Sequence, residues 1–200
     1  MRAWYKAVST KYPRLVAGAT ACTVLTSADL TCQTILQPPG ENDTGYDWSR
    51  TAGLALFGLL YYGGPCKSLY LYFDKVMGTK PTPRTVVIQT FVDCYIHTPV
   101  ALIPSFYLIT NSVKGKSLDE TRVQLEREWF EASFGSVLFW TPAQLVNFWC
   151  VPQHSKILFV ACFSFIHKTW LSWLSNRHDH NNRLELQRER HQLATSSRVQ

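Results

Sequence analysis

Long stretches with at most one charged side chain constrain this chain more than any other feature. Five such tracts occur, at 15–40, 51–66, 85–113, 132–153 and 157–176, and the only charged residues in them are Asp29, Asp93 and Lys168. A helix that crosses the hydrocarbon core of a bilayer needs about 20 predominantly apolar residues. A soluble bundle would instead carry charges along the outer face of every helix. The sequence therefore predicts an all-α integral membrane bundle with four to five transmembrane helices.

The first half of the chain divides into three predicted helices. The first begins after Pro13 and ends before the Pro38–Pro39–Gly40 turn. The second begins near Trp48 and continues to Met77, and its Gly64–Pro65 pair predicts a bend, because proline removes a backbone donor. The third covers about 85–110 and contains Pro99, a second predicted bend. Internal prolines of this kind are tolerated in membrane helices when neighbours satisfy the freed carbonyls.

The second half begins with a segment of a different kind. Residues 117–131 mix apolar side chains with alternating charges behind a Ser117–Glu120 capping box, which predicts one interfacial amphipathic helix. An apolar helix over 132–151 follows, with Pro142 and Pro152 as predicted bends, and a last apolar helix covers 155–175. We expect one membrane-embedded domain over residues 1–175 and a polar, charged tail over 176–200.

Charge and cysteine usage limit the classes of function. The net charge is +6, and no acid precedes Asp29, as in mitochondrial targeting segments. The basic residues flank the apolar tracts and form no dense run, so they predict contacts with anionic lipid headgroups rather than with nucleic acid. The six cysteines show no metal-ligand spacing, and catalytic motifs such as a phosphate loop or HExxH are absent from the sequence. We therefore expect no enzyme activity, no metal and no cofactor.

Polar residues inside the apolar tracts are the candidate site, because buried polarity in a membrane is costly and marks function by default. They are spaced along single faces of three predicted helices: Asp29 with Gln33; Gln89, Asp93 and His97; and Gln144 with Asn147. One interpretation is a shared, hydrated interior in which the two aspartates set cation preference. The other is a set of interhelical hydrogen bonds that fix the packing.

Residues spread along the chain follow the pattern of a known family. At the C-terminal side these are Trp140, Gln144, Asn147, Phe148, Val151, Pro152, Lys156, Trp170, Leu174 and Ser175. Upstream they are Asp29 with Gln33, Gly64–Pro65, and Asp93 with Pro99. In these residues the chain resembles the Mpv17/PMP22 family of small integral membrane proteins of mitochondria and peroxisomes. The chain departs from the family pattern at Ala28, Cys94, Ser68 and Thr141, and the tail beyond Ser175 lies outside the resemblance.

The resemblance implies a non-enzymatic, channel-like protein of the mitochondrial inner membrane, linked to metabolite homeostasis, with the peroxisomal membrane as the second possible location. The alternative is an accessory structural subunit of a large inner-membrane complex, such as a respiratory-chain complex. The altered motifs and the charged tail favour this alternative. The partners expected are the lipid bilayer and either other subunits of such a complex or a second copy of the chain.

Overall fold

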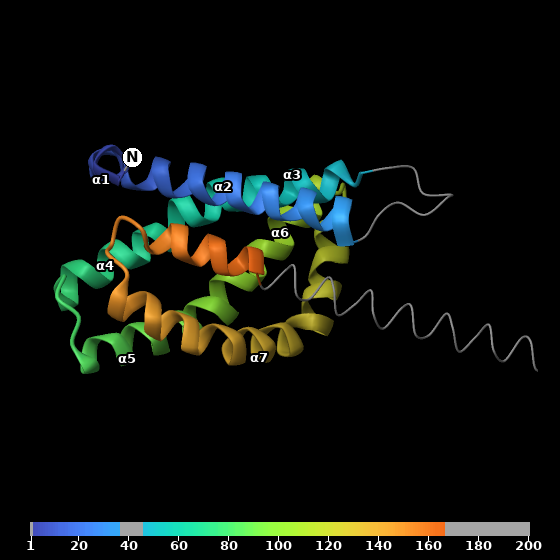
Figure 1. Ribbon diagram of the computed structural model, residues 1–200. Helices are drawn as coiled ribbons and strands as arrows, with labels where there is room; N and C mark the ends of the chain where they lie inside the picture. Colours follow the sequence, from blue (N-terminus) through green and yellow to red (C-terminus); the bar gives the residue numbers. More distant parts are fainter. Residues whose placement is uncertain (1, 37–45, 167–200) are drawn as a thin grey trace, which may run out of the picture.

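The computed structural model describes residues 2–36 and 46–166, and within these ranges every regular element is helical (Figure 1). This confirms the all-α class. The predicted tail over 176–200, the end of the last predicted helix and the loop at 37–45 lie outside the described residues. Two described helices are long and apolar enough to cross a membrane, Pro13–Thr34 and Pro83–Val113. The two or three further crossings stay a prediction.

The chain runs back and forth along the bundle axis (Figure 1). Helix α1 (Arg2–Lys11) precedes α2 (Pro13–Thr31), which continues as the π-helix η1 (Cys32–Leu36). The second passage is α3 (Trp48–Phe57), the π-helix η2 (Gly58–Cys66) and α4 (Lys67–Met77) without interruption. The third is α5 (Pro83–Phe91), the π-helix η3 (Val92–Leu102) and α6 (Ile103–Val113). Helix α7 (Leu118–Cys150) returns, and the helix Lys156–Ile166 follows.

Local sequence explains where these helices begin and end. Pro13 occupies the first turn of α2, where its missing N–H costs nothing. Asp47 caps α3 by accepting a hydrogen bond from the Arg50 N–H at 2.9 Å. The predicted Ser117–Glu120 capping box is present at the start of α7, which confirms that boundary. Gly78, with φ of +81°, ends α4 in a conformation that favours glycine.

Two parts of the helical pattern differ from the sequence-based expectation. Helix α1 was not predicted; Figure 1 shows it nearly end-on beside the start of α2. The interfacial helix expected over 117–131 and the apolar helix expected over 132–151 form the single helix α7. No proline or turn sequence separates the two segments, so the helix continues through the change in composition. Figure 1 shows that the two parts of α7 run in different directions.

The predicted bends have separate structural settings. Pro65 lies inside η2 and Pro99 inside η3, so both occur where the backbone has widened to π-helical spacing. Pro142 lies inside α7. Pro152 lies beyond the end of α7, in a turn closed by a 2.8 Å hydrogen bond from the Ser155 N–H to its carbonyl. Pro152 therefore follows the helix end and does not bend a helix, because the turn begins at that residue.

A tryptophan on α7 satisfies a carbonyl that η3 leaves free. The Ile103 N–H donates to the Thr98 carbonyl, five residues back. At the same spacing, an N–H on residue 104 would donate to the Pro99 carbonyl, but residue 104 is a proline. Pro104 has no N–H to donate. The indole Nε1–H of Trp129 donates to the Pro99 carbonyl at 2.8 Å instead. This bond fixes the first part of α7 against η3.

Glycines allow α2 and η2 to pack with their backbones in close contact. A Cβ on Gly58 would lie 2.8 Å from the Cys22 nitrogen, and one on Gly18 would lie 2.5 Å from the Leu59 carbonyl oxygen. Small residues at such contacts are typical of membrane helix pairs, where packing drives association. An aromatic core continues from this contact through Phe57, Tyr61, Tyr70, Phe73 and Phe148.

The distribution of polarity differs from that in a soluble domain. Large apolar side chains such as Val87, Phe91 and Val100 on the third passage and Leu138 on α7 are exposed. Asp93 and Asn147, in contrast, are buried. This arrangement fits a bundle whose outer surface faces lipid and whose polar groups bond to one another inside.

Candidate functional site

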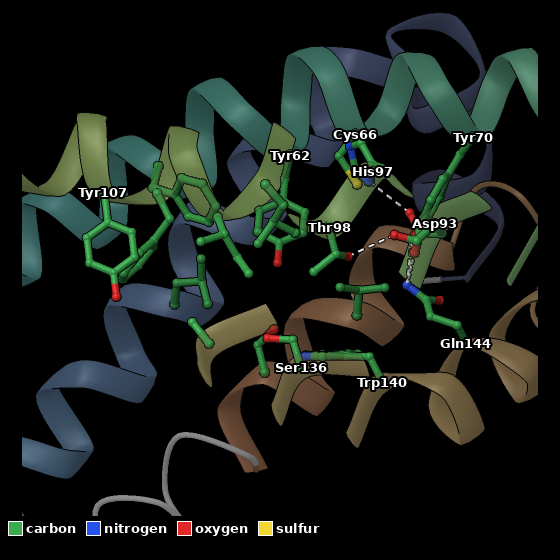
Figure 2. Close-up of a pocket in the computed structure, with 18 residues that line it drawn as sticks. Tyr62, Cys66, Tyr70, Asp93, His97, Thr98, Tyr107, Ser136, Trp140 and Gln144 are labelled. Carbon is green, nitrogen blue, oxygen red and sulfur yellow. Dashed lines mark hydrogen bonds and ion pairs between the residues drawn. The ribbon is translucent and has the colours of Figure 1, made fainter. Parts of the chain in front are cut away.

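A cavity of about 270 Å³ lies inside the bundle, bounded mainly by η2, η3, α6, α7 and the helix Lys156–Ile166, with single residues from α2, α3 and α4 (Figure 2). Its walls are largely aromatic and aliphatic, with polar groups at a few positions. Figure 2 shows Asp93, His97, Tyr70 and Gln144 gathered at one end of the cavity and Tyr107 at the other end. The cavity therefore has a charged end and a long, mostly apolar remainder.

The Asp93 carboxylate is the centre of the charged end. Its Oδ2 accepts hydrogen bonds from the Gln144 amide at 2.6 Å and from the Tyr70 hydroxyl at 3.3 Å. Its Oδ1 lies 3.0 Å from Nδ1 of His97, one helical turn along η3. The Asp93 main-chain carbonyl accepts the Thr98 hydroxyl at 2.8 Å. Burial of a carboxylate is tolerated when its oxygens are hydrogen-bonded in this way.

His97 links Asp93 to a second helix. Its Nε2 lies 2.7 Å from the hydroxyl of Tyr61 on η2, and the two rings stack with centroids 5.7 Å apart. With Asp93 ionised and His97 neutral, Nδ1 of His97 donates to the carboxylate and Nε2 accepts the Tyr61 hydroxyl. The result is a hydrogen-bonded chain of three titratable groups, Tyr61, His97 and Asp93, which joins η2 to η3.

The two amides of α7 complete this network. Gln144 donates to both Asp93 and the Tyr70 hydroxyl, the latter at 2.8 Å, and its own oxygen accepts the Asn147 amide at 2.7 Å. Asn147 is fully buried, and Gln144 lines the cavity. Asn147 therefore orients Gln144, and Gln144 holds α7 against η3 and α4. We call Asp93, His97, Tyr61, Tyr70, Gln144 and Asn147 the Asp93 network.

Asp29 and Gln33 belong to a different cluster, formed between α2, η1 and α3. One Asp29 oxygen lies 2.8 Å from Nε of Arg50, and the other accepts Gln33 and Thr51, each at 2.7 Å. Gln33 also accepts the Asp47 N–H at 2.8 Å and thus supports the cap of α3. None of these residues lines the cavity. This cluster connects two helices.

The predicted polar residues are therefore divided in space. Asp93, His97, Gln144 and Asn147 form one network, Asp29 and Gln33 form another cluster, and Gln89 is buried on α5 outside both. Sequence reasoning missed Tyr61, Tyr70 and Thr51. Four tyrosines within an almost uncharged segment, at 61, 62, 70 and 72, were an available signal, because a buried tyrosine hydroxyl usually needs a partner.

The cavity is suited to water or to a small polar solute. Beyond the Asp93 network it presents hydroxyl-bearing side chains from five elements, which are Tyr62, Thr98, Tyr107, Ser136 and Ser164. Hydroxyl groups can both donate and accept, so they can replace part of a hydration shell. A cavity with apolar walls and a few convergent polar groups is the usual form of a small-molecule site.

Comparison with known proteins gives a consistent relationship. The sequence profile of the Mpv17/PMP22 family matches residues 111–172. The zebrafish mitochondrial inner membrane protein Mpv17 is 25% identical over 86% of this chain and 96% of its own length. Protein SYM1 of Kluyveromyces lactis is 26% identical over 85% of this chain and 87% of its own. PXMP2/4 family protein 2 of Dictyostelium discoideum is 30% identical over 68% and 70%. No solved structure shows significant similarity.

The relatives agree with the apolar outer surface described above. Two of them, from zebrafish and cattle, are named mitochondrial inner membrane proteins, and this chain aligns with 96% of the length of each. The protein is accordingly a mitochondrial inner-membrane protein. The matched profile covers the Gln144–Asn147 segment of the Asp93 network, and the relatives extend the similarity over most of the chain. The chain belongs to the Mpv17/PMP22 family.

Proposed function

We propose that the protein is a non-enzymatic, channel-like component of the inner membrane, and that the cavity beside the Asp93 network is the polar part of its solute path. The observation that carries this proposal is the position of the network. A carboxylate, a histidine and an amide from two passages of the chain meet at the end of a 270 Å³ cavity, inside a bundle whose exterior is apolar.

The proposal assigns different roles to the two polar clusters. Asp93 and His97 line the cavity, so a passing solute would meet the Asp93 carboxylate. Asp29 is occupied by Arg50, Gln33 and Thr51, away from the cavity, and acts in helix packing. In a confined site of low dielectric constant, one acidic group changes the relative entry of cations and anions strongly.

The test is electrical recording from the purified protein in planar bilayers. Wild-type protein should conduct, and Asp93→Asn should shift the reversal potential in a salt gradient towards weaker cation preference. Asp119→Asn is the matched control, because Asp119 is exposed in the first turn of α7. Equal shifts in both variants would argue that surface charge, and not the cavity, sets selectivity.

The alternative, an accessory subunit of a large inner-membrane complex, gives the opposite result. In that case the purified protein does not conduct, and after mild detergent extraction it migrates entirely with the complex on a native gel. The exposed apolar side chains of the third passage would then cover a partner subunit instead of lipid. We favour the channel-like function because a packing subunit has no need for a cavity lined by Asp93 and His97.

A further inference from the structure

Two lysines are buried at the end of the bundle that also holds α1. Lys67, the first residue of α4, has only 3% of its surface exposed, and Lys156, the first residue of the last described helix, has 6%. Fully buried lysines are rare unless they are paired, because an ammonium group loses its hydration on burial. Neither residue lines the cavity described above.

The described part of the protein does not balance these two charges. Lys67 Nζ donates to the main-chain carbonyl of Gln153 at 2.9 Å. Lys156 Nζ lies 3.9 Å from Asp74 Oδ1 and 5.1 Å above the ring of Phe148. Each ammonium has three donors. One carboxylate, at a long distance, therefore faces two positive charges.

An unpartnered amide lies in the same place. Both the Nε2 and the Oε1 atoms of the Gln153 side chain are buried, and neither has a hydrogen-bond partner among the described residues. The main-chain carbonyl of this same residue holds Lys67. A buried amide without a partner loses its bonds to water and gains nothing in return, so it calls for a ligand.

The surrounding charge has the same sign. This end of the bundle is formed by residues 2–14, 67–84 and 148–158 (Figure 1), in which Asp74 is the only acidic residue. The basic residues in these ranges whose side chains the structure describes are Lys11, Arg14, Lys67, Lys75, Lys80, Arg84 and Lys156. The centroids of the His154 and Tyr5 rings lie 6.5 Å apart, which brings α1 to the same location. An anion is therefore drawn to this end by the whole local field.

We propose that Lys67, Lys156 and the Gln153 amide bind a phosphoryl oxyanion. Its oxygens accept hydrogen bonds from the two ammonium groups and from the Gln153 NH₂, and its charge balances the excess that Asp74 leaves. Two sources share this chemistry, the headgroup of an anionic phospholipid and soluble phosphate. We expect the headgroup, because basic pockets at the ends of membrane helices are typical lipid sites. The site does not depend on the channel-like function.

The test uses the full chain in nanodiscs, with the melting temperature followed by tryptophan fluorescence. Replacing part of a phosphatidylcholine bilayer with phosphatidylglycerol or cardiolipin should raise the melting temperature of the wild type, because a ligand that binds only the folded state stabilises it. Lys67→Met and Lys156→Met should lose this rise. Lys75→Met, an exposed lysine on the same helix, should keep it.

A second measurement separates the two sources. Inorganic phosphate is titrated into wild-type protein held in pure phosphatidylcholine. A rise that Lys67→Met abolishes identifies soluble phosphate as a ligand of the site; a rise with anionic lipid alone identifies the headgroup. No rise of the wild type with either anion overturns the proposal, and this readout stands even if a variant does not fold. The proposal is also overturned if the melting temperatures of Lys67→Met and Lys156→Met rise as much as that of the wild type.

Discussion

Gln144 is the residue on which most of the Asp93 network depends. It donates to Asp93 and Tyr70 and accepts from Asn147. Gln144→Leu keeps the size of the side chain but removes one hydrogen bond from Asp93 and one from Tyr70. It also leaves the buried Asn147 amide without its partner, at about 1–3 kcal/mol for such a group. We expect a clearly lower free energy of unfolding in detergent. Leu145→Ala, on a more exposed part of the same turn, should cost much less; similar losses would show that the network contributes little.

Glu128 gives α7 a pH dependence outside the membrane-spanning helices. Hydrogen bonds from the Tyr107 hydroxyl, at 2.7 Å, and from Arg127 lower the pKa of the Glu128 carboxyl below its usual value. A carboxyl with a lowered pKa in the folded state stabilises the fold above its unfolded pKa of about 4.3 and loses this effect as the pH falls through the folded value.

This sign leads to a measurable difference between two proteins. Between neutral pH and about pH 4 or below, a glutamate becomes protonated. Over this range the melting temperature of the wild type should fall more than that of Glu128→Gln. Glu126→Gln, which removes an exposed carboxyl two residues away that is ion-paired with Arg122, serves as the control. Parallel curves for the wild type and Glu128→Gln would contradict the assigned role of the Tyr107 bond.

At the scale of helices, the contact between α2 and η2 sets how tightly the bundle closes. A Cβ on Gly58 would meet main-chain atoms of Ala21 and Cys22 at 2.8–2.9 Å, and main-chain atoms cannot rotate away. We expect Gly58→Ala to destabilise the protein by about 1–3 kcal/mol, as overpacking does. Gly64→Ala lies on the same π-helix with nothing within 4 Å and should be neutral or stabilising. Thermal unfolding of the two variants side by side measures the difference.

Most helix boundaries could be predicted because local chemistry fixes them. Pro13, the region around Trp48, Met77 and the Ser117 capping box all mark observed starts or ends. The continuity of α7 could not be predicted in the same way. Its composition changes near residue 131, and such a change looks like a helix boundary. Only the absence of a turn sequence at that point indicates that the helix continues.

At the scale of the whole molecule, the sequence predicts which polar residues share a helix face, but not which helix that face meets. Asp29 and Asp93 are equivalent in sequence, as lone acids in apolar tracts. In the structure Asp29 meets Arg50 on α3, whereas Asp93 meets Gln144 on α7 beside a cavity. Tyr61 and Tyr70 escaped prediction because tyrosine is common both in aromatic cores and in hydrogen-bond networks, and spacing does not distinguish the two.

The central claim is that solute passes through the cavity beside the Asp93 network. Ser136 lines this cavity from α7, whereas Leu138, two residues later, is 63% exposed on the outer surface of the bundle. Ser136→Phe therefore fills the cavity, and Leu138→Phe adds an aromatic ring to the same helix where lipid would meet it. The two variants differ in the side of α7 that they change.

The deciding measurement is the conductance of these two variants and the wild type in planar bilayers, normalised to the amount of folded protein. We expect Ser136→Phe to lose most of the conductance and Leu138→Phe to retain it. Equal conductance of Ser136→Phe and wild type would contradict the claim, because a solute path through the cavity cannot stay open when an aromatic ring occupies it.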